Sequence, residues 1–153
     1  MIVHKVELVT PSSHTRLITS TISIRVRVYP EERELPTLTR HCSDARYVWN
    51  LPLEQRNFWV RDRSQKISCN AQARELAEAR KEIWLREDSS AIQQQALRDL
   101  DRAVQNCRNE PDHFGRPTWR KAGIHEGFAI RDLSVRRIDR KWGQVFVPKC
   151  GWV

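Results

Sequence analysis

The stretch ISIRVRVYPEERELPTLTRHCSDARYVWN, residues 22–50, contains the change of pattern that decides the fold. Over residues 22–29 apolar side chains alternate with polar or aromatic ones, and this period of two predicts a β-strand with one buried face. The other face carries Arg25 and Arg27, and Pro30 ends the strand. Beyond Pro30 the apolar spacing changes to three and four residues, so we expect the strand to lead into a helix.

Three helical segments are expected after this strand. The first begins near Leu35, accommodates Pro36 in its first turn, is kinked or restarted at Pro52, and continues to about Trp59. One apolar stripe runs along this helix and consists of Leu35, Leu38, Cys42, Ala45 and Trp49.

The second and third helical segments follow in the middle of the chain. The second covers about residues 70–86 and is expected to bury Ala73, Leu76, Ala77, Ile83 and Trp84. The third has the clearest signals, because Ser90 and Gln93 stand at capping-box spacing and Pro111 closes the segment. Its inward stripe consists of Ile92, Ala96, Leu100, Ala103 and Cys107.

Short strands are predicted again after residue 111. They cover Phe128–Arg131, Val135–Ile138 and Gln144–Val147, and a turn over Asp139–Gly143 joins the last two into a hairpin. Because neither end of the chain has enough strands to be stable alone, we expect strand 22–29 to lie beside residues 144–147 in one sheet.

The order strand, helices, strands predicts an α+β protein in which a helical insert interrupts a small sheet. We expect residues 22–30 and 111–153 to form the β part and residues 31–110 to form the helical insert. Residues 1–21 are expected to be a poorly ordered extension.

The excess positive charge is concentrated at the two ends of the chain. The 153 residues contain 27 Lys and Arg against 19 Asp and Glu, a net charge of +8. This excess lies in residues 1–30 (+3) and 111–153 (+5), whereas residues 31–110 are neutral. Arginine, whose planar guanidinium suits phosphates and guanine edges, supplies 21 of the cations, although nucleotide bias in the coding DNA is an alternative origin. The two ends are therefore the natural surface for a polyanion.

The sequence contains no arrangement typical of an enzyme active site. It has no G-x-S-x-G motif and no glycine-rich phosphate loop. His41 and Cys42 are neighbours on a helix and point about 100° apart, so they are not expected to form a dyad. The four cysteines lack the close spacing of a zinc site and are expected to be small buried side chains. No catalytic residue, metal site or cofactor is expected.

Secretion and membrane insertion are not expected either. The first twenty residues contain charged side chains within the region that a signal peptide keeps apolar. No apolar stretch approaches the ~18 residues of a membrane span. The expected location is cytoplasmic.

The tryptophans indicate where nucleic acid could bind. Trp49 and Trp84 lie on apolar helix faces and are expected in the core. Trp119, Trp142 and Trp152 each lie within three residues of a Lys or Arg, an arrangement that stacks bases and holds phosphates. Packing on the open side of a thin sheet is the alternative for the last two, whereas the basic loop around Trp119 favours nucleic-acid binding.

Five segments occur in an order and spacing that resemble a known family. They are RVYP (27–30), RHCSDARYVWN (40–50), WLREDSSAIQQQALRDLDRAV (84–104), FGRPTWRKAG (114–123) and VPKCGWV (147–153). Together they resemble the N-terminal part of the OrfB/TnpB proteins of insertion sequences, the transposon-encoded, RNA-guided nucleases related to type V CRISPR effectors. The resemblance covers about residues 22–153.

This resemblance carries expectations about fold and partners. It implies that the strands build a wedge-like β-barrel or sheet and that the helices form an inserted recognition lobe containing a helix-turn-helix. It also implies a role in DNA transposition, with DNA and a guide-type RNA as partners. The residues that we expect to bind nucleic acid are Arg25, Arg27, Arg46, Tyr47, Asn50, Arg116, Trp119, Arg120, Lys121, Arg136 and Arg137.

The family's nuclease half, with its RNase H-like carboxylates and zinc ribbon, follows the segment matched by VPKCGWV. Because this sequence stops at Val153, the resemblance implies a truncated, nucleic-acid-binding product that is not an enzyme. The alternative function is a stand-alone helix-turn-helix regulator that reads duplex DNA through residues 35–60, although the neutral helical middle disfavours it. A product that is not folded or not used is the remaining alternative.

Overall fold

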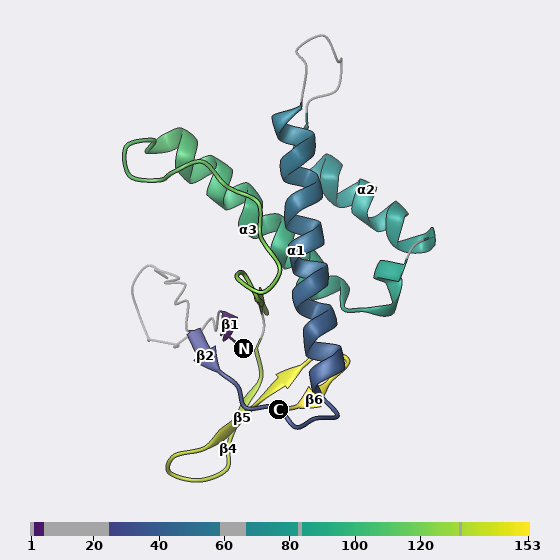
Figure 1. Ribbon diagram of the computed structural model, residues 1–153, viewed down its shortest axis with the longest axis vertical. Coiled ribbons are helices and arrows are strands. Elements are labelled where there is room, and N and C mark those ends of the chain that lie inside the picture. The colour runs from purple at the N-terminus through teal and green to yellow at the C-terminus, as the bar shows by residue number, and fades with distance from the viewer. Residues whose placement is uncertain (1, 5–24, 59–66, 83, 132) are drawn as a thin grey trace, which may run out of the picture.

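The computed structural model has an α+β fold, which confirms the expected fold class (Figure 1). It describes residues 2–4, 25–58, 67–82, 84–131 and 133–153. The elements in chain order are β1 (Ile2–His4), β2 (Arg25–Arg27), α1 (Leu35–Asn57), α2 (Cys69–Glu82), the short 3₁₀ helix η1 (Trp84–Glu87), α3 (Ser90–Asn109), β3 (Gly127–Ala129), β4 (Val135–Arg137), β5 (Gly143–Val147) and β6 (Gly151–Trp152).

The strands form two three-stranded sheets, and neither closes into a barrel within the described residues. In the first sheet β1 lies between β2 and β3, antiparallel to β2 and parallel to β3, so that Val3 is opposite both Val26 and Phe128. In the second sheet β4, β5 and β6 are antiparallel. Of the two architectures that the resemblance allowed, the open sheet is the one observed.

The expected pairing of strand 22–29 with residues 144–147 is wrong. β2 pairs with β1, and β1 pairs with β3, so residues 2–4 take the position beside β2. A strand of three residues is too short to show a period of two, so the sequence does not distinguish residues 2–4 from the expected extension. The rest of that extension and residues 22–24 lie outside the described residues.

α1 is one continuous helix of 23 residues although it contains two prolines. Pro36 lies in the first turn, where a helix does not use the missing N–H. Pro52 lies inside the helix, where it removes one helical hydrogen bond, and its carbonyl accepts a hydrogen bond from Gln72 Nε2 at 3.0 Å. Because the helix runs without a turn over residues 35–57, a restart at Pro52 is not observed and the expected helix-turn-helix is not seen in the described residues.

α3 follows the predicted pattern except at its ends. α3 packs against α1 and buries Ile92, Ala96 and Leu100 as expected. The expected capping box is wrong, because the N-cap residue is Ser89, its side chain makes no capping hydrogen bond, and Gln93 is fully buried.

The end of α2 and its inward face also differ from the prediction. α2 ends at Glu82, before η1, rather than continuing to residue 86. Ala73 and Leu76 pack against the core, whereas Ala77 is exposed. Trp84, expected in the core, is 50% exposed, so that expectation is wrong. Ile83 lies outside the described residues.

One hydrophobic core joins the helices to both sheets. Its buried residues include Leu38, Cys42, Ala45 and Val48 from α1, Ile92, Ala96 and Leu97 from α3, and Phe128, Ile130, Val145 and Val147 from the C-terminal segment. The segments predicted as a β part and a helical insert therefore share their interior.

A buried polar network joins α1, α2, η1 and α3. Gln93 Nε2 donates to Asp44 Oδ2 at 2.5 Å and to the Leu85 carbonyl at 2.9 Å. Arg80 donates to Gln93 Oε1 and to the carbonyl oxygens of Leu85 and Asp88. Buried polar groups are costly unless they are hydrogen-bonded, and this network uses both ends of the Gln93 amide.

The pH dependence of unfolding tests this network. Burial raises the pKa of Asp44 from its ordinary value of 3.8 to about 6. Between these pH values the folded protein holds a proton on Asp44 that the unfolded chain has lost, so the contribution of Asp44 to stability falls as the pH rises. Asp44→Asn removes this titration and keeps an oxygen that can accept from Gln93. The free energy of unfolding of the variant relative to wild type should therefore increase by about 1–3 kcal/mol between about pH 4 and pH 7.

Urea unfolding at several pH values measures this difference. His41, whose pKa burial lowers, titrates in both proteins, so its contribution cancels in the difference. Asp112→Asn removes an exposed carboxylate from the turn after α3 and is the matched control for the loss of one charge. A difference between Asp44→Asn and wild type that is the same at every pH would contradict the buried position of Asp44.

Candidate nucleic-acid interface

The segment after α3, residues 115–121, runs back toward α1 before the chain enters β3 (Figure 1). We call this segment the basic loop; it has no regular secondary structure. Trp49 Nε1 of α1 donates to the Thr118 carbonyl at 2.9 Å. Asn50 Nδ2 donates to the Arg120 carbonyl at 3.0 Å, and the Arg120 N–H donates to Asn50 Oδ1 at 2.8 Å. Two neighbouring residues of α1 therefore hold the backbone of the basic loop.

Arg120 is attached to α1 by its side chain as well as by its backbone. Its guanidinium carbon lies 3.9 Å from the centroid of the Trp49 ring, a cation–π contact. Burial lowers the pKa of Arg120, and the negative charge of Asp99 opposes this effect. Arg120 is half-buried, so it is less available to a phosphate than an exposed arginine.

The turn after the basic loop, residues 122–126, is fixed by an ion pair with α1. Gly123 has a φ of +76°, a conformation that favours glycine, and its N–H donates to Glu126 Oε1 at 2.8 Å. The same carboxylate oxygen accepts from Arg46 Nη1 at 2.8 Å, and Arg46 Nη2 donates to Ser43 Oγ at 3.1 Å. Arg46, expected to bind nucleic acid, is therefore a structural partner of this turn.

Two cations and one aromatic side chain of the basic loop are exposed. They are Arg116 and Lys121, and Trp119, which is 47% exposed. The Lys121 backbone is held separately, because its N–H donates to His125 Nδ1 at 2.9 Å. Exposed cations beside an exposed aromatic ring can bind phosphates and stack a base.

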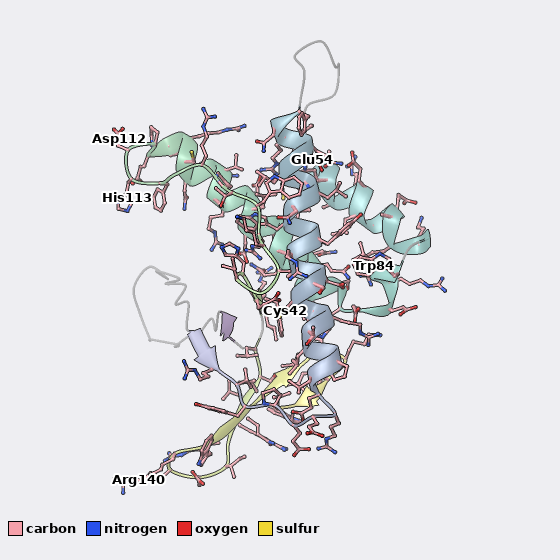
Figure 2. All side chains as sticks on the ribbon, in the orientation of Figure 1. Cys42, Glu54, Trp84, Asp112, His113 and Arg140 are labelled. Atoms are coloured by element: carbon pink, nitrogen blue, oxygen red, sulfur yellow. The ribbon has the colours of Figure 1, made fainter. Side chains whose placement is uncertain are left out.

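A second basic surface lies on the β4–β5 hairpin, whose formation confirms the predicted hairpin. Asp139 Oδ1 shapes its tip by accepting the N–H groups of Lys141 at 2.6 Å and Trp142 at 2.8 Å. Figure 2 shows Arg140 at the far end of this hairpin. Trp142 is 57% exposed, and its ring makes an edge contact with Tyr29.

The two arginines of β4 are exposed but oriented by neighbours. Arg136 Nε donates to Gln144 Oε1 at 2.7 Å, and its guanidinium carbon lies 4.5 Å from the centroid of the Trp152 ring. Arg137 Nε donates to the Asp139 carbonyl at 2.7 Å. Trp152 is half-buried. It therefore packs on the sheet and does not offer a free surface for stacking.

The expected binding residues do not all lie together. The basic loop and the hairpin occupy different parts of the molecule (Figure 1). Tyr47 makes an edge contact with Trp84 at 5.5 Å between ring centroids and lines a hollow between α1 and α2. Arg27 is exposed on β2, whereas the side chain of Arg25 lies outside the described residues.

Trp49 is the site residue that the sequence pattern did not identify. It continues the apolar stripe of α1, and this position predicted a core residue, yet it is half-buried and contacts the basic loop. Its partners lie about seventy positions away in sequence, so no local pattern indicates them. In the sequence, only its position next to Asn50, an expected binding residue, indicates that Trp49 belongs to the site.

The described residues contain no group of three or more His, Cys, Asp or Glu side chains that could hold a metal ion. The acids of α3 have partners, since Asp99 accepts from Gln95 Nε2 at 2.8 Å and Asp101 accepts from Arg56 at 2.9 Å. Burial raises the pKa of the Cys42 thiol to about 11, which disfavours a reactive thiolate. No helix in the described ranges is both long and apolar enough to cross a membrane.

Comparison with known proteins finds a relative in Escherichia coli. No protein-family model matches the chain. The chain is 26% identical over 134 residues, 86% of its length, to "Putative RNA-guided DNA endonuclease InsQ" of Escherichia coli (strain K12). This similarity confirms the resemblance to OrfB/TnpB proteins. The chain spans about a third of InsQ, since the match covers 32% of that protein.

Proposed function

We propose that this chain is a nucleic-acid-binding part of an OrfB/TnpB-type transposase and that its 153 residues bind RNA and DNA without cleaving them. The observation that carries the proposal is the basic loop, in which the exposed cations Arg116 and Lys121 flank the exposed Trp119 in the sequence. The name of InsQ, which refers to an RNA-guided DNA endonuclease, supports nucleic acid as the class of ligand.

Phosphate contacts would come from the exposed cations of the basic loop and the strands. We assign them to Arg27, Arg116, Lys121, Arg136 and Arg137. Arg25 joins them by its position two residues from Arg27 on β2. Phosphate contacts provide affinity without reading sequence, and stacking on Trp119 and Trp142 would favour unpaired bases.

The proposed partners are DNA and a guide-type RNA, and the proposed process is DNA transposition. In this proposal residues 31–110 act as the helical insert and residues 22–30 and 111–153 as the β part that presents most of the cations. The role of the helices is to hold the basic loop in place, as α1 does through Trp49 and Asn50.

The test measures binding and cleavage in the same reactions. The purified chain is incubated with magnesium or manganese and with fluorescently labelled single-stranded RNA, single-stranded DNA or duplex DNA. We expect anisotropy to report binding and gels to show intact strands. Metal-assisted hydrolysis needs carboxylates that converge on a metal ion, and the described acids of α3 are paired with amides or cations instead.

Three outcomes would contradict this function. Metal-dependent cleavage that an Asp or Glu substitution within the chain abolishes would overturn the non-catalytic role. The absence of binding at low salt would overturn the binding role. Tight binding to one duplex sequence with two matched half-sites would favour the helix-turn-helix regulator instead.

A further inference from the structure

We infer that Asn50 and Trp49 are positioning residues that hold the basic loop on α1, so that Arg116, Trp119 and Lys121 meet nucleic acid from a fixed backbone. Asn50 itself makes no contact with nucleic acid in this account. The inference rests on the proposed nucleic-acid binding and assigns roles within that site.

The side-chain amide of Asn50 is hydrogen-bonded to the backbone of Arg120 through both its oxygen and its nitrogen. Its oxygen accepts the Arg120 N–H at 2.8 Å, and its nitrogen donates to the Arg120 carbonyl at 3.0 Å. An asparagine that reads adenine uses this same pair of groups, one donor and one acceptor, on the base edge. Asn50 would have to release Arg120 before it could read a base in that way.

Trp49 holds the basic loop at a second point, Thr118, which lies two residues before Arg120. Its indole N–H donates to the Thr118 carbonyl, and its ring lies against the Arg120 guanidinium. The backbone is thus held immediately before and immediately after Trp119. The exposed Trp119 ring therefore stands on a segment whose backbone freedom is restricted on both sides.

The attachment has a predictable effect on affinity. A loop without regular secondary structure must lose conformational freedom when it binds a ligand, and a loop that is already ordered avoids this cost. Asn50→Ala leaves every exposed cation in place, so a role in direct contact and a role in positioning make different predictions. We expect Asn50→Ala to weaken RNA binding by about tenfold through the lost order of the loop.

A double-mutant cycle distinguishes the two roles. Single-stranded RNA is titrated into wild type, Asn50→Ala, the double variant Trp119→Ala/Lys121→Ala, and the combination of all three substitutions. Positioning predicts that Asn50→Ala has little effect once Trp119 and Lys121 are removed, because the loop then has less to present. An equal loss in both backgrounds would assign Asn50 to direct contact and overturn the inference.

Hydrogen exchange at the Arg120 amide gives an independent readout. Asn50→Ala removes its acceptor and should speed exchange, whereas Asn50→Asp keeps an acceptor oxygen and should restore protection. Unchanged exchange in Asn50→Ala would overturn the inference. Asn57→Ala, at an exposed asparagine on the same helix, is the matched control and should change neither exchange nor affinity.

The Trp49→Phe variant and the wild-type binding measurement complete the test. Trp49→Phe keeps an aromatic ring and removes the donor to Thr118, so it should show a smaller loss with the same dependence on Trp119 and Lys121; no such dependence would count against the inference. If wild type binds no nucleic acid, the proposed function fails and the inference fails with it. If wild type binds and the cycle is additive, only the inference fails.

Discussion

Leu38→Ala is expected to lower the free energy of unfolding by about 2–5 kcal/mol. Leu38 lies on α1, its side chain is 0% exposed, and it belongs to the core that joins the helices to both sheets. The substitution removes buried methyl groups and leaves a cavity, and both effects destabilise the folded state. A loss of this size is a large fraction of the stability of a small domain.

Urea unfolding followed by helical circular dichroism measures the loss. Leu51→Ala changes a leucine on the same helix that is 40% exposed and lines the hollow between α1 and α2, so it should cost less than about 1 kcal/mol. Equal losses for Leu38→Ala and Leu51→Ala would mean that α1 buries a different face.

Elements with a strong local period could be predicted from the sequence. The spacing along α1 and α3 identified Leu38, Cys42, Ile92 and Leu100 as buried, because a helix repeats its inward positions every three or four residues. The β4–β5 hairpin was predictable for the same reason, since both its strands and its turn residues lie within a short segment.

Pairing between distant segments could not be predicted in this way. β1 has three residues and β6 has two, which is too short for a period of two to be recognised. β1 pairs with β2 and with β3, more than one hundred residues further along the chain, and no local pattern specifies such a partner. The expected pairing of strand 22–29 with residues 144–147 was wrong for this reason.

In the candidate site, too, local sequence features were predictable and contacts between distant segments were not. Clustering of charge near an aromatic residue indicated Arg116, Trp119 and Lys121, and all three are exposed. The contacts that hold their backbone come from Trp49 and Asn50, whose partners lie about seventy residues away. An apolar stripe predicts burial but cannot tell a core tryptophan from one that supports a loop.

Neutralising the cations of the basic loop is expected to weaken binding to RNA and DNA of every sequence. Each phosphate contact contributes about 0.7–0.9 to the slope of log affinity against log salt concentration. Arg116→Ala/Lys121→Ala should therefore make this slope shallower by about 1.4–1.8. The loss should be similar for unrelated sequences, because phosphate contacts do not read bases.

The matched control removes the same charge from another surface. Arg74→Ala/Lys81→Ala neutralises two exposed cations of α2, which lies outside both proposed binding surfaces. This double variant has the same net charge as Arg116→Ala/Lys121→Ala and should keep the wild-type slope. A slope that becomes equally shallow in both double variants would mean that net charge, rather than the basic loop, determines binding.

The salt dependence of RNA binding, measured for the wild-type chain and for Arg116→Ala/Lys121→Ala, is the most direct test of nucleic-acid binding by the basic loop. We predict that wild-type affinity falls by about 100-fold or more between about 50 and 200 mM salt if five or more phosphates are contacted, and that the double variant gives a measurably shallower line. Wild-type affinity that does not change over this range, or two lines with the same slope, would contradict nucleic-acid binding by the basic loop.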